Sequence, residues 1–349
     1  MRLRPKTVCI GLLALVPVLI LIATITSHVL NFLHLFRNHS GIRLTQQAAL
    51  DAYNNNNNAN VNNTANQSTR PRQLVPKIIH QVFHNWKQPG NDTLPEDWQE
   101  VRQTCIDLNP DFEVKLWTEL SSWDFIAREY PWFLDTYEGY RFPVQRVDAV
   151  RYFLMLHYGG IYIDLDNGCT SNLSPLLYYP VWIPDPGRGA LSNNILAARP
   201  NHPFWSLLVN RLYEYAYTYP FPYITISYAS GAWFQTDVWE EYHALLPKAE
   251  TTPGQENRLY RLMMDERVEE GADRWVFFSQ HRGQTWVNWD NVLFNWVGEH
   301  LAVVLLGVLV MVGGSTWWCV RVLRGRRSWG YERIESVKDE ELQEVGSVR

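Results

Sequence analysis

The sequence predicts an α/β protein with an open sheet, because strand-like and helix-like segments alternate through its middle part. Val75–Phe83 is an apolar run typical of a fully buried strand. Phe112–Trp117 alternates apolar and polar residues, as a half-buried strand does. A helical segment lies between the two. Since ligands of open α/β sheets bind at the carboxyl ends of the strands, we expect the site there.

Three helices are predicted in the same region from apolar spacing and end signals. The first begins near Pro95, where proline and acidic residues suit the first turn, and it ends at Asn109. The second covers Ser121–Tyr130. The third covers Pro143–Tyr158 and is closed by a pair of glycines, so it leads directly into the next strand.

That next strand is a short apolar run ending in two acids separated by one residue. In an extended chain alternate side chains share a face, so we expect Asp164 and Asp166 to point the same way and Ile163 and Leu165 to face the core. Two carboxylates at this spacing suit a hard divalent cation, which often shares its ligands with a diphosphate. Because an isolated D-x-D is common, a plain acidic turn is the alternative.

Asp148 and Arg151 lie three residues apart on the third helix and therefore share a face. A carboxylate accepts hydrogen bonds from sugar hydroxyls, and a guanidinium donates to hydroxyls or phosphate. Gly159 and Gly160 allow a tight helix end and the close approach of a ligand. A salt bridge on a solvated helix surface is the alternative for the charged pair.

A second candidate region is Phe277–Trp286, an apolar strand that would present His281 and Trp286 at its end. Imidazole is a common metal ligand, and an indole N–H can donate to a phosphate oxygen. A lone histidine is, however, more often structural than a ligand. Elsewhere, tyrosines alternate with other residues from Tyr213 to Tyr223. They suit either a surface that meets lipid or sugar, or an aromatic core.

Two apolar segments, Val8–Ile25 and Leu301–Val320, are each long enough to cross a bilayer as a helix. Basic residues flank their outer ends, which predicts that both termini are cytosolic and the middle is lumenal. A cleaved signal peptide is the alternative for the first segment. The expected division is a cytosolic terminus 1–7, an anchor 8–29, an Asn-rich stem 30–73, a globular domain 74–295, an anchor 300–320 and a disordered cytosolic tail 321–349.

The stem is predicted to be flexible, because its polar sequence around Asn54–Asn58 cannot bury enough apolar surface to offset the entropy of ordering it. Outside the apolar segments the cysteines are Cys105 and Cys169, for which one disulfide or two free thiols remain open. The net charge is -5, so the sequence lacks the excess of basic residues that binding to nucleic acid needs. Five N-x-S/T sequons fit a lumenal middle: Asn38, Asn62, Asn66, Asn91 and Asn172.

The run RVDAVRYFLMLHYGGIYIDLDNG, with PKIIHQVF upstream and HRGQTW downstream, closely resembles the D-x-D glycosyltransferases of family 32. The resemblance covers roughly Leu74–Asp290. It implies a GT-A-type domain, a nucleotide-sugar donor, retention of anomeric configuration, and Mn²⁺ or Mg²⁺ bridging the D-x-D to the donor diphosphate. An anchor at each end of a lumenal domain is similar to the fungal mannosyl phosphorylinositol ceramide synthases. That likeness implies GDP-mannose as donor, inositol phosphoceramide as acceptor and a Golgi membrane location.

The resemblance assigns overlapping roles to positions of this sequence. It departs at Phe83, where related strands often end in tryptophan, and before Trp286, where a serine is common. The implied catalytic residues are Asp148, Arg151, Asp164, Asp166 and Trp286. The implied donor-binding residues are Phe83, Asp148, Arg151, Gly159, Gly160, Tyr162 and Asp164. The implied metal ligands are Asp164, Asp166 and His281.

Two alternatives to this function stay open at the level of sequence. One keeps the enzyme and changes its substrates, as in an initiating-type α-1,6-mannosyltransferase of N-glycans or another family 32 transferase. The other is a catalytically silent partner subunit of a true transferase. The intact Asp-x-x-Arg and D-x-D argue against the silent partner, and the sequence does not reveal whether a regulatory subunit is needed.

Overall fold

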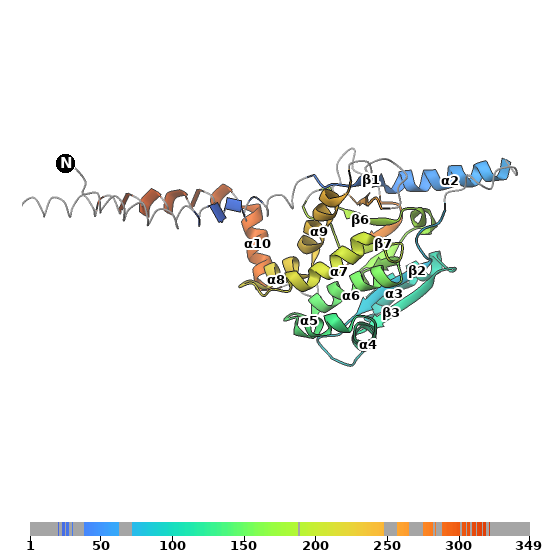
Figure 1. The fold of residues 1–349 in the computed structure, drawn as a ribbon, viewed down its shortest axis with the longest axis horizontal. Coiled ribbons are helices and arrows are strands. Elements are labelled where there is room, and N and C mark those ends of the chain that lie inside the picture. The colour runs from blue at the N-terminus through green and yellow to red at the C-terminus, as the bar shows by residue number, and fades with distance from the viewer. Residues whose placement is uncertain are drawn as a thin grey trace, which may run out of the picture. The chain divides into compact units, whose positions relative to one another are not determined.

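The computed structural model describes residues 38–62, 72–187, 189–247, 257–264, 275–281, 283 and 288–300, with single positions in 20–30 and 302–321. The chain divides into two compact units, Met1–Trp286 and Val287–Arg349. The first unit holds the main sheet (Figure 1). The second contains helix α10, Trp289–Glu299.

A mixed sheet forms the centre of the first unit. Its strands are β1 Ile42–Thr45, β2 Ile78–Phe83, β3 Glu113–Thr118, β4 Gly160–Ile163, β6 Val181–Asp185, β7 Ile195–Ala198 and β8 Tyr260–Met263. Their order across the seven-stranded sheet is β1-β8-β6-β7-β4-β2-β3. Neighbours are parallel except at β7, which runs antiparallel to β4 and β6. Two further strands, β5 Asn167–Cys169 and β9 Phe278–Gln280, form a separate antiparallel pair.

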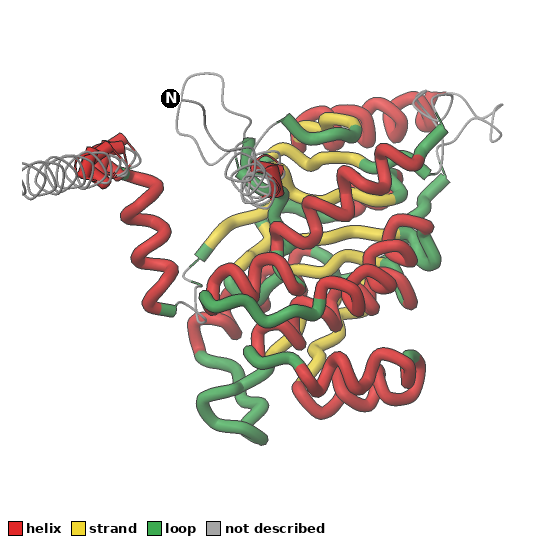
Figure 2. The backbone as a smooth tube through the Cα atoms, turned by 60° about the vertical axis from the view of Figure 1, so that its left-hand side comes forward, coloured by secondary structure: helices red, strands yellow, loops and turns green. Residues whose placement is uncertain are grey.

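Helices cover both faces of this sheet (Figure 2). Their bounds are α2 Gln46–Asn62, α3 Glu96–Leu108, α4 Glu119–Glu129, α5 Leu134–Gly139, α6 Pro143–His157, α7 Pro203–Tyr215, α8 Pro222–Ala229 and α9 Ala232–Leu245, with 3-10 turns at Pro131–Phe133 and Ser174–Tyr178. One hydrophobic core packs α4, α6, α7 and α9 on the sheet, and the other packs α2, α3 and β5. Along β4, Tyr162 faces the first core while Ile161 and Ile163 face the second, as strand alternation requires.

The predicted α/β architecture is confirmed, and so are the strand and helix segments that lead to the D-x-D. Helix α6 is buried around almost its whole circumference, which places Asp148 and Arg151 in the interior rather than on a solvated helix surface.

The expectation of a flexible stem over 30–73 is wrong for much of its length. β1 and α2 lie within that stretch, and β1 pairs in parallel with β8 at the edge of the main sheet. Leu44 and Ala49 are buried, and the fully buried Gln46 bonds the backbone of residues more than 200 positions away. The polar composition led to the wrong prediction because a few buried residues hold α2 in place. The rest of the helix surface, including Asn54–Asn58, is exposed.

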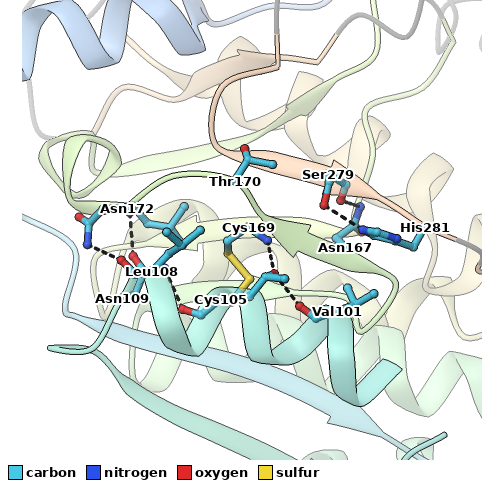
Figure 3. The surroundings of a disulfide bond; sticks show 12 residues. Val101, Cys105, Leu108, Asn109, Asn167, Cys169, Thr170, Asn172, Ser279 and His281 are labelled. Atoms are coloured by element: carbon cyan, nitrogen blue, oxygen red, sulfur yellow. Dashed lines mark hydrogen bonds between the residues drawn. A yellow bond between two sulfur atoms is a disulfide. The ribbon is translucent and has the colours of Figure 1, made fainter. Parts of the chain in front are cut away.

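Cys105 and Cys169 form a disulfide, which resolves the two alternatives left open by the sequence. The bond joins α3 to β5, the strand that follows the D-x-D (Figure 3). It therefore fixes the helix beside the strand on which the D-x-D turn ends.

Among the residues described, no helix is both long enough and apolar enough to cross a membrane. The expected anchors 8–29 and 300–320 lie largely outside the described residues, as do the termini 1–7 and 322–349. Both anchors remain predictions from sequence.

Candidate functional site

A cavity of about 550 Å³ opens at the carboxyl ends of β2 and β4, where the alternating pattern predicts the site. Asp148, Arg151, Asp164 and Asp166 all line it. The end of β2 and the start of α3 form one wall, and α8 with the start of α9 forms another. A cavity of this size is within the range of small-molecule sites.

The two D-x-D acids reach the cavity from a turn and not from an extended strand. β4 ends at Ile163, and the chain turns through Leu165 and Asp166 before β5 begins. The turn is closed by a hydrogen bond of 2.9 Å from the Asn167 N–H to the Asp164 carbonyl. The expectation that strand alternation makes both carboxylates point the same way is therefore corrected. Leu165 is buried as expected, although it also lines the cavity.

Asp148 is held by three partners in the interior. Its Oδ1 lies 3.2 Å from Nη2 of Arg151 and accepts a hydrogen bond of 3.0 Å from Asn193 Nδ2. Its Oδ2 accepts a hydrogen bond of 3.1 Å from the Ser230 hydroxyl. Both Asp148 and Arg151 are 4% exposed. The i, i+3 spacing thus produces a buried ion pair whose carboxylate has a fixed orientation.

Arg151 connects Asp148 to the first acid of the D-x-D. Its Nη1 lies 3.4 Å from Asp164 Oδ1 and donates to the Asn193 carbonyl at 2.6 Å. The guanidinium stacks over the Tyr162 ring at 4.7 Å, and the Tyr162 hydroxyl donates to Asp164 Oδ1 at 2.5 Å. One cation therefore holds two carboxylates in place, with the buried Tyr162 supporting both charges.

The electrostatics of the cluster favour the binding of additional positive charge. Burial raises the pKa of Asp148 to about 7 against the opposing charge of Arg151, and Asp164 adds to the rise. Burial, followed by the charge of Asp164, raises the pKa of Asp166 to about 6. Burial also raises the pKa of Asp164, although Arg151 and Tyr162 oppose it. For Arg151, burial is outweighed by the neighbouring acids, which raise its pKa above the usual value. Arg151 alone does not compensate three acids, so a further cation would be stabilised here.

Asp166 has different surroundings from Asp164. Within the part of the chain that the structure describes, its carboxylate has no ion pair or hydrogen bond to another side chain. Gly283 lies directly against it, because a Cβ at that position would be 1.8 Å from Asp166 Oδ2. The Asp166 carbonyl accepts a hydrogen bond of 2.8 Å from the His281 N–H. The segment after β9 thus borders the second D-x-D acid.

The His281 imidazole is not gathered with the two aspartates. Its Nε2 pairs with the Ser279 hydroxyl at 3.0 Å, beside β5 and the disulfide (Figure 3). Among the described residues, no three His, Cys, Asp or Glu side chains come together as a metal cluster. The described contacts do not join the His281 imidazole to either aspartate, so the metal set Asp164, Asp166 and His281 stays a prediction. Trp286 lies outside the described residues, so its predicted contact with phosphate stays a prediction.

The residues present still suit a divalent cation. Mg²⁺-type sites commonly use one or two carboxylates and complete their coordination with water and substrate phosphates. Asp166 supplies a carboxylate that no other described side chain occupies, and Asp164 lies two residues before it. The donor set is all oxygen and anionic, which is the chemistry that hard cations prefer.

Gly159 and Gly160 are not at the cavity, which corrects their expected role in donor binding. They lie at the other end of β4, where Gly159 precedes the strand and Gly160 is its first residue, with φ of +64° and +88°. A Cβ would lie 2.6 Å from the Ala198 carbonyl at Gly159 and 2.6 Å from the Ile78 carbonyl at Gly160. These glycines therefore serve a left-handed turn packed against neighbouring strands. Tyr162 likewise supports Arg151 and Asp164 from within the core.

Phe83 does line the cavity, at the end of β2, with its ring edge-on to Trp98 at 6.1 Å. Asn193 and Ser230 were missed by sequence reasoning, although both bond Asp148. Asn193 precedes β7, and Ser230 follows α8. Neither belongs to a motif with Asp148, so no sequence signal identifies them.

The site lies within a region that matches a known family. A family model described as a glycosyltransferase sugar-binding region containing the DXD motif matches residues 95–184. That range includes Asp148, Arg151, Asp164 and Asp166. The four cavity-lining residues therefore lie within the matched range, and the match defines the class as a glycosyltransferase sugar-binding region.

Individual relatives give a more specific comparison within this class of glycosyltransferases. The chain is 39% identical to inositol phosphoceramide mannosyltransferase 2 of Schizosaccharomyces pombe, over 67% of this chain and 64% of the relative. It is 37% identical to the mannosyl phosphorylinositol ceramide synthase CSH1 of Saccharomyces cerevisiae, over 74% of this chain and 67% of the relative. It is 30% identical to inositol phosphoceramide mannosyltransferase 1 of Schizosaccharomyces pombe, over 73% and 76%. The chain belongs to the family of these DXD-containing glycosyltransferases.

The match spans less than two thirds of some relatives: 64% of inositol phosphoceramide mannosyltransferase 2, and 62% of the mannosyl phosphorylinositol ceramide synthase SUR1 of Saccharomyces cerevisiae, to which 71% of this chain is 36% identical. Among solved structures, the PaToxG glycosyltransferase is similar over 57% of this chain and 78% of its own, with 15% identity and a TM-score of 0.36. That likeness is too weak to define the fold.

Proposed function

We propose that the protein transfers mannose from GDP-mannose to inositol phosphoceramide, with Mn²⁺ or Mg²⁺ at the D-x-D of a GT-A-type domain. The observation that carries the proposal is that the buried pair Asp148 and Arg151 and the half-buried Asp164 and Asp166 line one cavity, with Arg151 bonded to both Asp148 and Asp164. The names of relatives at 36–39% identity supply the sugar and the acceptor.

Each residue of the cluster has a chemical task in this transfer. Asp166, with Asp164, would hold the cation, whose contribution when bound is to neutralise charge on the leaving diphosphate. Arg151 is charged and positioned to donate hydrogen bonds to a phosphate or sugar oxygen. Asp148 has a fixed orientation and would accept a hydrogen bond from a mannose hydroxyl. Such preorganisation lowers the cost of orienting the donor.

The stereochemistry and the cellular setting belong to the same proposal. Retention of configuration follows from the family 32 resemblance, and no described residue at the site stands out as a covalent nucleophile. Front-face attack guided by the leaving phosphate is therefore favoured. The apolar segments 8–29 and 300–320 are proposed to anchor the protein in the Golgi membrane with the cavity lumenal, as their basic flanks indicate. Protection of the middle of the chain from added protease in sealed vesicles would test this topology.

The decisive experiment is mannosyl transfer by the purified full chain in detergent. Wild-type protein with GDP-mannose, inositol phosphoceramide and Mn²⁺ should form mannosylated product, and a chelator should stop it. Asp166→Asn should reduce turnover at least 100-fold while the thermal unfolding profile is retained. Full activity of the chelated enzyme, or of Asp166→Asn, contradicts the proposed metal role.

Assays with two kinds of acceptor, an N-glycan-type oligosaccharide and inositol phosphoceramide, distinguish the alternative functions. Transfer to an N-glycan-type oligosaccharide in preference to inositol phosphoceramide would favour the N-glycan reading. Absence of both transfer and metal-dependent GDP-mannose hydrolysis would favour the silent partner.

A further inference from the structure

We propose that the α8–α9 wall of the cavity is the acceptor site, and that it binds the uncharged polyhydroxylated ring of inositol phosphoceramide, whose apolar chains, joined to the ring through a phosphodiester, leave along a strip of tyrosines. This assignment rests on the proposed function and adds the surface that recognises the second substrate. The α8–α9 wall is defined by six residues that line the cavity: Tyr223, Ile226, Ser227, Gly231, Ala232 and Trp233.

The two sides of the cavity differ in charge. The described residues of the α8–α9 wall are all uncharged, whereas Arg151 and Lys87 line other parts of the cavity. A diphosphate needs cations, so it belongs with Arg151 and the D-x-D. The α8–α9 wall instead offers aromatic, aliphatic and hydroxyl groups, which suit a ring with apolar faces and hydroxyl edges.

The α8–α9 wall is joined to the reacting centre by hydrogen bonds. The Ser230 hydroxyl, between α8 and α9, donates to Asp148 Oδ2 at 3.1 Å. The Ser230 carbonyl accepts from the Tyr152 hydroxyl at 2.9 Å. A ring on this wall is therefore next to the carboxylate that would hold the donor sugar. This placement is what a transfer between two substrates requires.

Small residues allow the chain to pack closely at the junction of the two helices. A Cβ at Gly231 would lie 2.9 Å from the Ile226 carbonyl, so a larger residue would displace backbone there. Ala232 follows it at the start of α9. The aromatic part of the wall is Trp233, which packs edge-on against Tyr223 at 5.4 Å.

A strip of rings leads from this wall to the surface. Trp233 contacts Tyr228 at 5.1 Å, Tyr228 contacts Tyr219 at 5.9 Å, and Tyr219 contacts Tyr217 at 5.1 Å. Tyr217 is 64% exposed. Because tyrosine combines an apolar ring with a polar hydroxyl, such a strip suits the chains of a lipid at a membrane surface. Only part of the alternating tyrosine run takes part: Tyr213 is 65% exposed but lies on α7, outside the strip.

Tyr213 provides a matched control for Tyr217, since both are tyrosines with nearly the same exposure. With the full chain in detergent, Tyr217→Ala should raise the KM for long-chain inositol phosphoceramide roughly tenfold, equivalent to about 1.4 kcal/mol. The KM for GDP-mannose and the rate of its metal-dependent hydrolysis should stay the same. Tyr213→Ala should change none of these values. Equal acceptor KM values for the two variants would overturn the assignment.

Two further measurements test the same assignment. One measures lipid binding without turnover, and the other changes a residue of the α8–α9 wall itself. Titration of the full chain with micellar inositol phosphoceramide should show weaker binding for Tyr217→Ala than for Tyr213→Ala. Trp233→Phe, which keeps an aromatic ring, should raise the acceptor KM and leave the donor KM unchanged. Wild-type protein that binds this lipid but never transfers mannose would contradict the proposed function and support the acceptor site. Transfer with unaltered lipid binding in Tyr217→Ala would contradict the acceptor site and support the function.

Discussion

The two aspartates of the D-x-D lie two positions apart yet have opposite surroundings. Asp164 is tied to Arg151 and Tyr162, and through Arg151 to Asp148. Asp166 has no side-chain partner among the described residues and borders the backbone of Gly283. We interpret Asp164 as the acid that also orders Arg151, and Asp166 as the acid whose carboxylate is more available to a ligand. A single short motif thus combines a carboxylate that is fixed by its neighbours with one that is not.

The strongest test of this contrast is the removal of Arg151. Arg151→Met leaves Asp148 and Asp164 without their shared cation in a buried site, so stability should fall by about 3–5 kcal/mol. Thermal or denaturant unfolding of the full chain in detergent measures the change. Arg128→Met removes a surface ion pair with Glu129 and should leave unfolding nearly unchanged. Similar unfolding of the two variants would show that the cluster is not structural.

Part of this cluster could be predicted from sequence, because it depends on local spacing. The i, i+3 positions of Asp148 and Arg151 and their helix leading into β4 are visible in the chain itself. The hydrogen bonds of Asn193 and Ser230 to Asp148 could not be predicted, since both residues reach it from loops brought near only by the fold. The turn at the D-x-D could not be predicted either, because an extended strand and a strand followed by a turn have the same apolar pattern.

The N-terminal segment shows the same limit on a larger scale. Its polar composition predicted a flexible stem, yet β1 pairs with β8 and Gln46 bonds segments from the far end of the unit. Such pairings join residues more than 200 positions apart, and no local pattern records them. What composition predicted correctly is that the outer surface of α2 is exposed.

Gln46 links that segment to the Asp166 side of the site. Its Oε1 accepts hydrogen bonds of 2.8 and 2.9 Å from the N–H groups of Val276 and Phe277, which lead into β9 and His281. Gln46→Ala leaves both N–H groups buried without this acceptor and should cost about 2–3 kcal/mol. Hydrogen exchange should increase at residues 276–280 and remain slow in α6. Gln47→Ala, which removes only an exposed bond to Asp51, is the control. An equal increase in hydrogen exchange at residues 276–280 and in α6 would contradict a local role for Gln46.

A smaller effect is expected from pH in the chelated protein. Burial raises the pKa of Asp166 to about 6, so between about pH 4 and 6 the folded state binds more protons than the unfolded state. Stability should therefore decrease as pH rises through this window, by about 1–2 kcal/mol from this group. Unfolding of wild-type and Asp166→Asn protein at about pH 3 and about pH 7, roughly one unit beyond each end of the window, with chelator present, measures the difference. The variant should show the shallower slope. Identical slopes would show that Asp166 is not the group responsible.

The smallest expected change in stability comes from a substitution that moves the Asp166 carboxylate and leaves the fold intact. Gly283→Ala would place a methyl 1.8 Å from Asp166 Oδ2, but the end of an aspartate side chain can rotate away at little cost. Unfolding should thus change by less than about 0.5 kcal/mol. The displaced carboxylate should weaken Mn²⁺ binding, measured by titration, roughly tenfold. Gly139→Ala, at a position with open space around its Cβ, should affect neither quantity. Unchanged Mn²⁺ affinity in Gly283→Ala would mean that the ion is held without Asp166, and the division of labour between the two aspartates would then be wrong.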